Sequence, residues 1–292
     1  MNNKRENNTR ETKSFGLLLV VLAAVLALIL GFAVPEIWAG KNNEENDDDE
    51  IEFALAKLFF ELNHTDGDLG IHALIDGEPW KKLRIEDPYE RKLLDVKVKG
   101  RLRKQGLTGF FFESAEPTFD DLSPKKFFNR FPEGWYEIEG KTLDGEEMEG
   151  EVFLSHRMPA PADGITLNYG NPIDLDEVDC DDDDTIPTVD DGPVVISWEP
   201  VNMSHPDPDG GGAGVRPQVD VTIHNYEVVV EVELDLNGKE FSSIFSIILP
   251  PDVTLISIPE EFIAQGVEFK YEILAREQNY NQTAVESCFV VE

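Results

Sequence analysis

The clearest pattern in the chain is an alternation of apolar and polar residues with a period of two, which recurs in short segments of its last hundred residues. Val194, Ile196 and Trp198 follow this spacing, which is typical of a strand with one face in a core. Asn237-Gly238 lies between two further alternating segments, and both residues tolerate the positive φ of a two-residue hairpin. About seven such segments over residues 193–292 predict a β-sandwich.

One of these segments changes phase. The apolar residues Val219, Val221 and Ile223 occupy odd positions, whereas from Tyr226 onward the apolar residues occupy even positions. A shift by one residue moves side chains to the other face of a strand, so we expect a bulge or a break near Asn225.

Residues 53–162 also contain short strand candidates, among them 58–62, 70–75 and 80–85. Ser123-Pro124 has the form of an N-cap followed by proline in the first helical position, and predicts a short helix. This part is interpreted as an Ig-like sandwich or a related all-β fold. The predicted fold class is therefore all-β, with two β-sandwich domains after an N-terminal hydrophobic helix.

That hydrophobic helix is predicted from the uncharged apolar run between Phe15 and Val34. A run of roughly 20 such residues is long enough to cross a bilayer, and the basic residues before it favour export of everything that follows. Residues 1–39 are therefore a signal peptide or a membrane anchor, and Pro35–Gly40 offers a tolerable cleavage site. The expected location is periplasmic, extracellular or at the cell surface.

Charge divides the exported part further. The chain has 59 Asp+Glu against 25 Lys+Arg, a net charge of −34, and such a field disfavours a nucleic-acid partner. Acidic residues dominate two stretches, 40–52 and 163–192. Runs of like charge repel themselves and stay extended, so both stretches are predicted to be linkers.

The C-terminal third contains four informative segments: Val195–Pro200, Tyr226–Val228, Gly266–Ala275 and Asn281–Ser287. The first includes Trp198 and resembles the second strand of a fibronectin type III domain. The others resemble the third strand of that domain, its sixth strand and the turn into its last strand. The resemblance covers residues 187–292 and implies a spacer or binding module. Phe269 departs from it, because the family usually has a corner Tyr there.

The chain contains two cysteines, Cys180 in the acidic stretch and Cys288 near the C-terminus. An even number of cysteines in an exported protein favours one disulfide between them. Such a bond would tie the predicted linker to the last strand. The alternative is a pair of unpaired thiols.

Candidate metal ligands gather in and after one predicted turn. Asp66, Asp68 and Asp76 are of the residue type that binds Ca²⁺, which prefers several oxygen ligands from a tight turn. The segment fails the EF-hand frame, so solvated acids in a β-turn are the preferred interpretation, and no cofactor other than Ca²⁺ is suggested. His64 and His72 would suit a transition metal by type, but unrelated surface histidines are favoured.

Four basic residues alternate near the middle of the chain: Lys97, Lys99, Arg101 and Arg103. They are predicted to lie on the solvated face of a strand. A second hypothesis is that they dock an acidic stretch of the same chain or of a neighbouring copy, which would make association sensitive to salt.

No recognisable catalytic motif accompanies these features. The sequence therefore predicts a non-enzymatic, exported structural or adhesion protein that uses its β-sandwiches for contacts with proteins or glycans. Two alternatives remain open at this point. One is an accessory subunit of a larger exported enzyme or surface complex, and the other is a Ca²⁺-dependent carbohydrate-binding protein.

Overall fold

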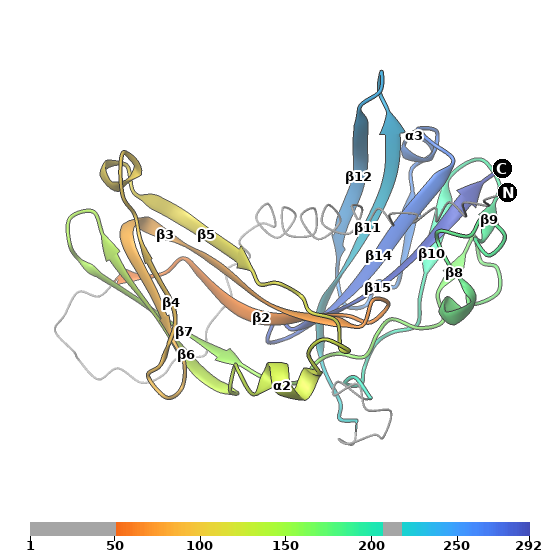
Figure 1. Cartoon of the computed structure of the whole chain (residues 1–292). Coiled ribbons are helices and arrows are strands. Elements are labelled where there is room, and N and C mark those ends of the chain that lie inside the picture. The colour runs from red at the N-terminus through yellow and green to blue at the C-terminus, as the bar shows by residue number, and fades with distance from the viewer. Residues whose placement is uncertain (1–50, 207–217) are drawn as a thin grey trace, which may run out of the picture.

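The computed structural model describes residues 51–206 and 218–292, and nearly all of its regular structure is β-strand (Figure 1). The predicted all-β fold class is confirmed. The predicted leader, residues 1–39, and nearly all of the first acidic stretch lie outside the described residues. No helix in the described part of the chain combines the length and the apolar character needed to span a membrane.

The N-terminal module comprises residues 51–162. Its elements are β1 (Ile51–Glu52), β2 (Leu55–Asn63), β3 (Asp68–Glu86), β4 (Lys92–Lys97), a 3₁₀ turn η1 (Leu102–Lys104), β5 (Leu107–Glu113), α2 (Pro124–Phe128), β6 (Gly134–Thr142) and β7 (Glu147–Leu154). Ser123 and Pro124 begin α2 as predicted.

The long strand β3 gives this module its curvature. Its first half pairs with β2 and β5, its second half pairs with β4 and β6, and the register shifts between Asp76 and Trp80. The sequence predicts two separate strands here, whereas the structure has one bent strand. Pro79 lies at the bend, where its missing N–H interrupts the ladder least. Trp80, which follows it, is fully buried in the core that the bent sheet encloses.

The C-terminal module comprises residues 163–206 and 218–292. Its elements are β8 (Thr166–Leu167), η2 (Leu175–Glu177), β9 (Thr188–Val189), β10 (Val194–Ser197), β11 (Ile223–Asp235), β12 (Glu240–Leu249), β13 (Leu255–Ile258), α3 (Glu260–Ile263), β14 (Glu268–Glu277) and β15 (Gln282–Val291). One sheet has the order β13-β10-β8, and it faces β12-β11-β14-β15 across a shared core.

Alternation along the strands places the expected side chains in this core. Val194 and Ile196 are fully buried, and Trp198 packs edge-on against Tyr226 with ring centroids 5.4 Å apart. Burial of such side chains contributes roughly 1.5–3 kcal/mol each. Phe269, the residue that departs from the fibronectin type III pattern, stacks on Phe289 with ring centroids 5.1 Å apart.

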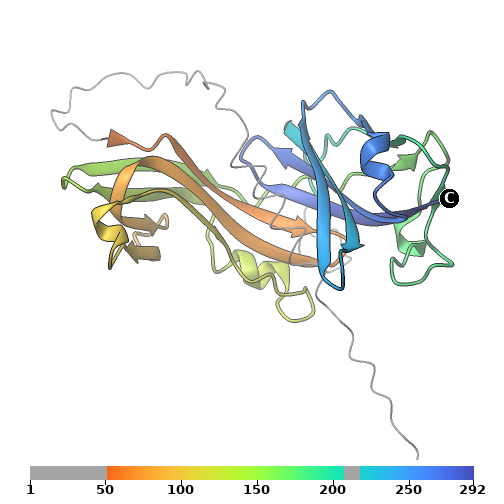
Figure 2. The ribbon, with the colours of Figure 1, turned by 90° about the horizontal axis from the view of Figure 1, so that it is seen from above.

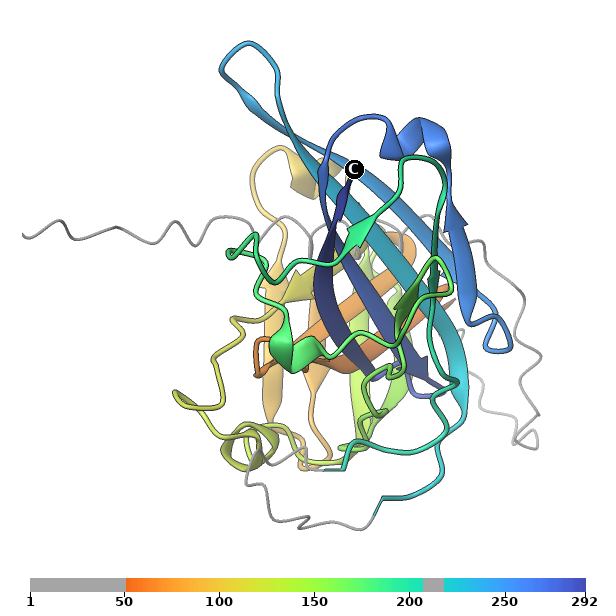
Figure 3. The ribbon, with the colours of Figure 1, turned by 90° about the vertical axis from the view of Figure 1, so that its right-hand side faces the viewer.

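The acidic stretch 163–192 differs from the predicted linker, because it is folded onto the C-terminal module. β8 pairs with β10, and β9 pairs with β15. Ile165, Leu167 and Val189 lie in the module's core, and their apolar side chains explain why the stretch does not remain extended. Figure 3 shows this segment in green, wrapped over one side of the sheet.

The two modules are not independent bodies on a tether. β2 of the N-terminal module pairs in parallel with β15, so that the larger sheet runs through both modules in the order β1-β7-β6-β3-β2-β15-β14-β11-β12. Figure 1 shows β2 and β3 passing from one module to the foot of the other, and Figure 2 shows the resulting elongated shape from above.

Candidate functional site at the junction of the two modules

Asn281, at the start of β15, fastens the two modules together. Its side-chain amide donates hydrogen bonds to the backbone carbonyls of Ser155 and Arg157, each at 2.8 Å. Its amide oxygen accepts a hydrogen bond from the backbone N–H of Phe60, also at 2.8 Å. Asn281 is fully buried, so these bonds do not compete with water. The junction is therefore a specific, hydrogen-bonded interface.

Polar side chains collect on one face of the shared sheet at this junction. Strand register places opposed and alternate residues on the same face. The group, called the junction cluster below, consists of Glu61 and Asn63 from β2, Asp68 and His72 from β3, Gln282 and Glu286 from β15, Glu272 and Arg276 from β14, and Glu227 from β11. The other face of the same strands supplies the two apolar cores.

Within this cluster, Glu61 and His72 meet a third side chain, Glu116, from the loop after β5. One ligand-type atom from each of the three lies within 4.8 Å of the others, and His72 Nε2 is 2.9 Å from Glu116 Oε1. Gly70 makes room for Glu116, because a Cβ at Gly70 would lie 2.2 Å from Glu116 Oε1. The triad therefore depends on β2, β3 and the loop together.

Burial and charge act in opposite directions on this triad. Burial raises the pKa of Glu61, and the neighbouring His72 partly offsets the rise. For His72, burial lowers the pKa, but the charges of Glu61 and Glu116 outweigh it and leave the pKa above its ordinary value. His72 has no exposed surface and Glu61 has 4%. The prediction that His72 is a surface histidine is therefore wrong.

Arg276 supplies positive charge to the other end of the cluster. Its guanidinium donates to the carboxylate of Glu227 and to the amide oxygen of Gln282. Gln282 in turn donates its amide N–H to the carboxylate of Glu61. This chain of hydrogen bonds connects β11, β14, β15 and β2 and orients Glu61 toward His72.

The remaining acids of the cluster repel one another. Burial, followed by the charges of Glu116 and Asp66, raises the pKa of Asp68 to about 7. Burial and the charge of Asp66 raise the pKa of Glu286 to about 7. Burial also raises the pKa of Glu272 well above its ordinary value. The cluster therefore has an affinity for protons, or for another positive charge.

In the presence of a metal chelator, we expect the full chain to be more stable near pH 5 than near pH 8. Asp68 and Glu286 have ordinary pKa values of 3.8 and 4.5 and folded values of about 7, so between these values the folded state binds more protons than the unfolded state. The free energy of unfolding then falls as pH rises, by a total on the order of 2–4 kcal/mol. The raised pKa of His72 acts in the same direction. Urea unfolding at both pH values measures the difference.

Glu286→Gln is expected to flatten this pH dependence, because the amide cannot ionise and its oxygen can still accept the hydrogen bond from Asn63. Glu240→Gln, at an exposed position of β12, is the matched control and is expected to leave the dependence unchanged. Equal or greater stability near pH 8 in the unaltered chain would contradict the prediction.

The structure separates the three predicted Ca²⁺ ligands. Asp66 lies in the β2–β3 turn and Asp68 begins β3, whereas Asp76 lies eight residues further along that strand. At about 3.3 Å per residue this is a distance of about 26 Å, so Asp76 cannot share an ion with the other two. A site that uses all three residues is therefore excluded. Asp68 instead belongs to the junction cluster, and Asp66 adjoins it.

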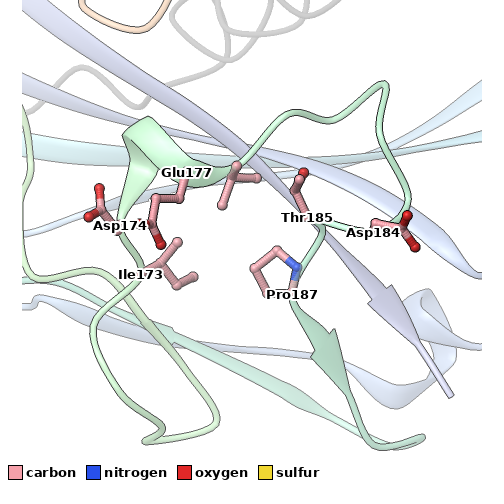
Figure 4. Close-up of a pocket in the computed structure, with 7 residues that line it drawn as sticks. Ile173, Asp174, Glu177, Asp184, Thr185 and Pro187 are labelled. Carbon is pink, nitrogen blue, oxygen red and sulfur yellow. The ribbon is translucent and has the colours of Figure 1, made fainter.

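The Asp-rich run between Asp174 and Asp184 borders an open cavity of about 520 Å³. Figure 4 shows Asp174 and Glu177 on one wall, with Asp184 across from them. Carboxylates of this run already accept hydrogen bonds from backbone N–H groups two residues ahead, as Asp174 does from Asp176. These local turns account for the shape of the run.

The four basic residues do not share a strand face. β4 ends at Lys97, and the chain then turns through Gly100, which has a φ of 64°. Lys99, Arg101 and Arg103 follow in the exposed β4–β5 connection. The prediction of a single strand face is wrong because the glycine turn ends the strand. All four side chains are exposed, and their docking to an acidic stretch stays a prediction.

The predicted disulfide is present. Cys180 in the acidic stretch is bonded to Cys288 in β15, with Cα atoms 5.9 Å apart. The bond ties residues 163–192 to the last strand of the shared sheet, as the sequence predicts.

Sequence reasoning did not select Glu61, Glu116 or Glu286 for the site. A signal existed for Glu61, because it interrupts the apolar segment Leu58–Leu62 with a charge. The same signal existed for Glu286, which lies between Val285 and Cys288, whereas Glu116 lies in a segment without such a contrast.

No family model matches the chain, and no curated protein matches it. Solved structures that resemble it include a bacterial ice-binding adhesin studied for host cell surface retention (10% identity, 84% of this chain, 66% of that chain, TM-score 0.21). Another is the BSP domain of a biofilm associated protein (10% identity, 82% of this chain, 29% of that chain, TM-score 0.23). A third is a Ca²⁺-stabilised adhesin with which an Antarctic bacterium binds ice (11% identity, 81% of this chain, 49% of that chain, TM-score 0.20). The chain thus spans 29% to 66% of their lengths. Similarity at this level does not bear on function.

Proposed function

We propose that this chain is a non-enzymatic, exported structural or adhesion protein whose two β-modules form one bent, rigid body and present their surfaces to protein or glycan partners. The observation on which the proposal rests is the shared sheet. A scaffold that positions its partners works best when its modules keep a fixed angle. The pairing of β2 with β15, together with the hydrogen bonds of Asn281, connects the two modules in this way.

The C-terminal module supports a spacer or binding role in a second way. We infer that it is a fibronectin type III-like module, and its division into β13-β10-β8 and β12-β11-β14-β15 supports that assignment. Such a fold does not itself define a ligand. The partners therefore follow from the surfaces and not from the architecture.

Export is the third element of the proposal. The Cys180–Cys288 disulfide is the kind of bond that persists in oxidising compartments. The apolar run at residues 15–34 would direct the chain there and, if it is not cleaved, would hold the protein at a membrane. We therefore place the folded part in the periplasm, in the extracellular space or at the cell surface.

The proposal is tested with cells that produce the full chain and cells that carry an empty vector. Both are passed under flow over surfaces coated with proteins and with a glycan panel, with and without Ca²⁺. We expect retention of the producing cells on at least one coating. The variant Asn281→Ala is expected to lose retention and to expose residues 156–162 to limited proteolysis. It leaves three backbone groups without partners, at a cost of roughly 2–4 kcal/mol.

Asn202→Ala is the matched control, because the side chain of Asn202 is exposed. A lack of retention on every coating, or turnover of a substrate by the purified chain, would contradict the proposal. A larger protein that copurifies in stoichiometric amount from native membranes would instead favour an accessory subunit. Retention that requires Ca²⁺ and one glycan would favour a carbohydrate-binding protein.

A further inference from the structure

The triad of Glu61, His72 and Glu116 offers one imidazole nitrogen and two carboxylate groups. A tetrahedral ion with bonds of about 2.0–2.2 Å places its ligands roughly 3.3–3.5 Å from one another. The triad atoms lie within 4.8 Å of one another, with the closest pair at 2.9 Å. Side-chain adjustments of about 1 Å therefore bring all three into this geometry, with the backbone unchanged.

The negative charge around the triad favours the binding of a cation. Glu61 and Glu116 both face His72, and Glu113 adds negative potential from β5. A protonated His72 would neutralise one of these charges, whereas a divalent ion bound to a neutral imidazole would neutralise two.

The environment of His72 distinguishes these two states. Nε2 points at Glu116, and within the described part of the chain Nδ1 is buried without a hydrogen-bond partner. A protonated ring would bury a second, strongly polarised N–H donor at Nδ1, and a buried donor without an acceptor is costly. A neutral ring that ligates a cation through Nε2 bears a weaker donor there. The orphaned nitrogen thus disfavours an imidazolium, and the contact between Nε2 and Glu116 identifies Nε2 as the nitrogen available to a ligand.

The surroundings also hold one of the three ligands, Glu61, in place. Gln282 donates to one oxygen of Glu61 and is itself held by Arg276, and such outer contacts orient metal ligands. The Glu116 side chain is 17% exposed, so the triad is in contact with solvent on that side.

We propose that Glu61, His72 and Glu116 form a binding site for one first-row divalent cation, with Zn²⁺ as the probe. Imidazole nitrogen suits such ions, whereas Ca²⁺ prefers oxygen ligands alone. This inference goes beyond the proposed function. The ion would fasten the loop after β5 to β2 and β3, and so would stiffen the part of the N-terminal module that lies beside β15.

The test uses the full chain without a polyhistidine tag, stripped with EDTA and dialysed. Isothermal titration with Zn²⁺ is expected to show one equivalent, and Co²⁺ is expected to give visible absorption bands that Zn²⁺ abolishes. Glu116→Gln is expected to weaken Zn²⁺ binding about 100-fold. Gly70→Ala changes no ligand but displaces the Glu116 carboxylate, and is expected to weaken binding at least about tenfold.

Asp76→Asn is the matched control. It removes one exposed carboxylate charge from the same strand, about 13 Å along β3 from His72, and is expected to leave Zn²⁺ binding unchanged. Circular dichroism checks the fold of each variant. If a variant fails to fold, the Co²⁺ spectrum of the unaltered chain still decides, because diffuse binding to surface acids gives no such bands. Absence of a stoichiometric Zn²⁺ site, or equal affinity in the Glu116 and Asp76 variants, would overturn the proposal.

Discussion

Replacement of Arg276 by methionine is expected to lower the free energy of unfolding by about 3–5 kcal/mol. Arg276 and its partner Glu227 are both almost completely buried, so the substitution leaves a carboxylate without its counter-charge in a site that water does not reach. The amide oxygen of Gln282 loses its donor at the same time, and the hydrogen bond from Gln282 to Glu61 is held less firmly. Chemical denaturation of the full chain near pH 7 measures the loss.

A double-mutant cycle separates the lost pair from the lost packing. Glu227→Gln combined with Arg276→Met is expected to cost less than the sum of the single substitutions, because neither charge is then left alone. Arg91→Met is the matched control, since Arg91 pairs with Asp87 at a position where its side chain is 63% exposed. Its cost is expected to be small, because exposed ion pairs contribute little to stability. A cost for Arg276→Met as small as that of the control would show that the buried pair contributes little.

Removal of the disulfide by Cys180→Ser and Cys288→Ser is expected to cost about 2–5 kcal/mol. The bond joins residues 108 positions apart, and closure of such a long loop restricts the unfolded chain strongly. The loss is also expected to release β9 from β15, so that residues 163–192 gain hydrogen exchange first. Urea unfolding and hydrogen exchange of the double variant measure both effects.

Reducing agent supplies the internal control for this result. It should destabilise the unaltered chain by a similar amount and should leave the double variant unchanged. Unfolding midpoints that are equal in the variant and the unaltered chain would contradict the prediction. A lower midpoint without faster exchange in residues 163–192 would place the effect in the unfolded state alone.

The sequence by itself determined those features that a single strand or turn contains. The burial of Trp198 follows from the period of two along its own segment. The all-β class follows from the recurrence of that period in many segments. The hairpin at Asn237-Gly238 has the expected positive φ values, 61° and 77°. The ladder shifts register between Ile223 and Asn225, where the alternation changes phase. The disulfide could be predicted because the chain has two cysteines and is expected to be exported to an oxidising compartment.

The tertiary structure alone decided what lies at the junction. Glu61 and Gln282 are 221 residues apart and are bonded, and Glu116 reaches His72 from a loop with no pattern of its own. The acidic stretch 163–192, a linker by charge, is folded because a few apolar side chains find the core of the C-terminal module. The alternation of apolar and polar residues predicts which face of a strand is buried, but it does not predict which other strand pairs with it. Buried charges are tolerated only where distant partners compensate them, and the fold supplies those partners.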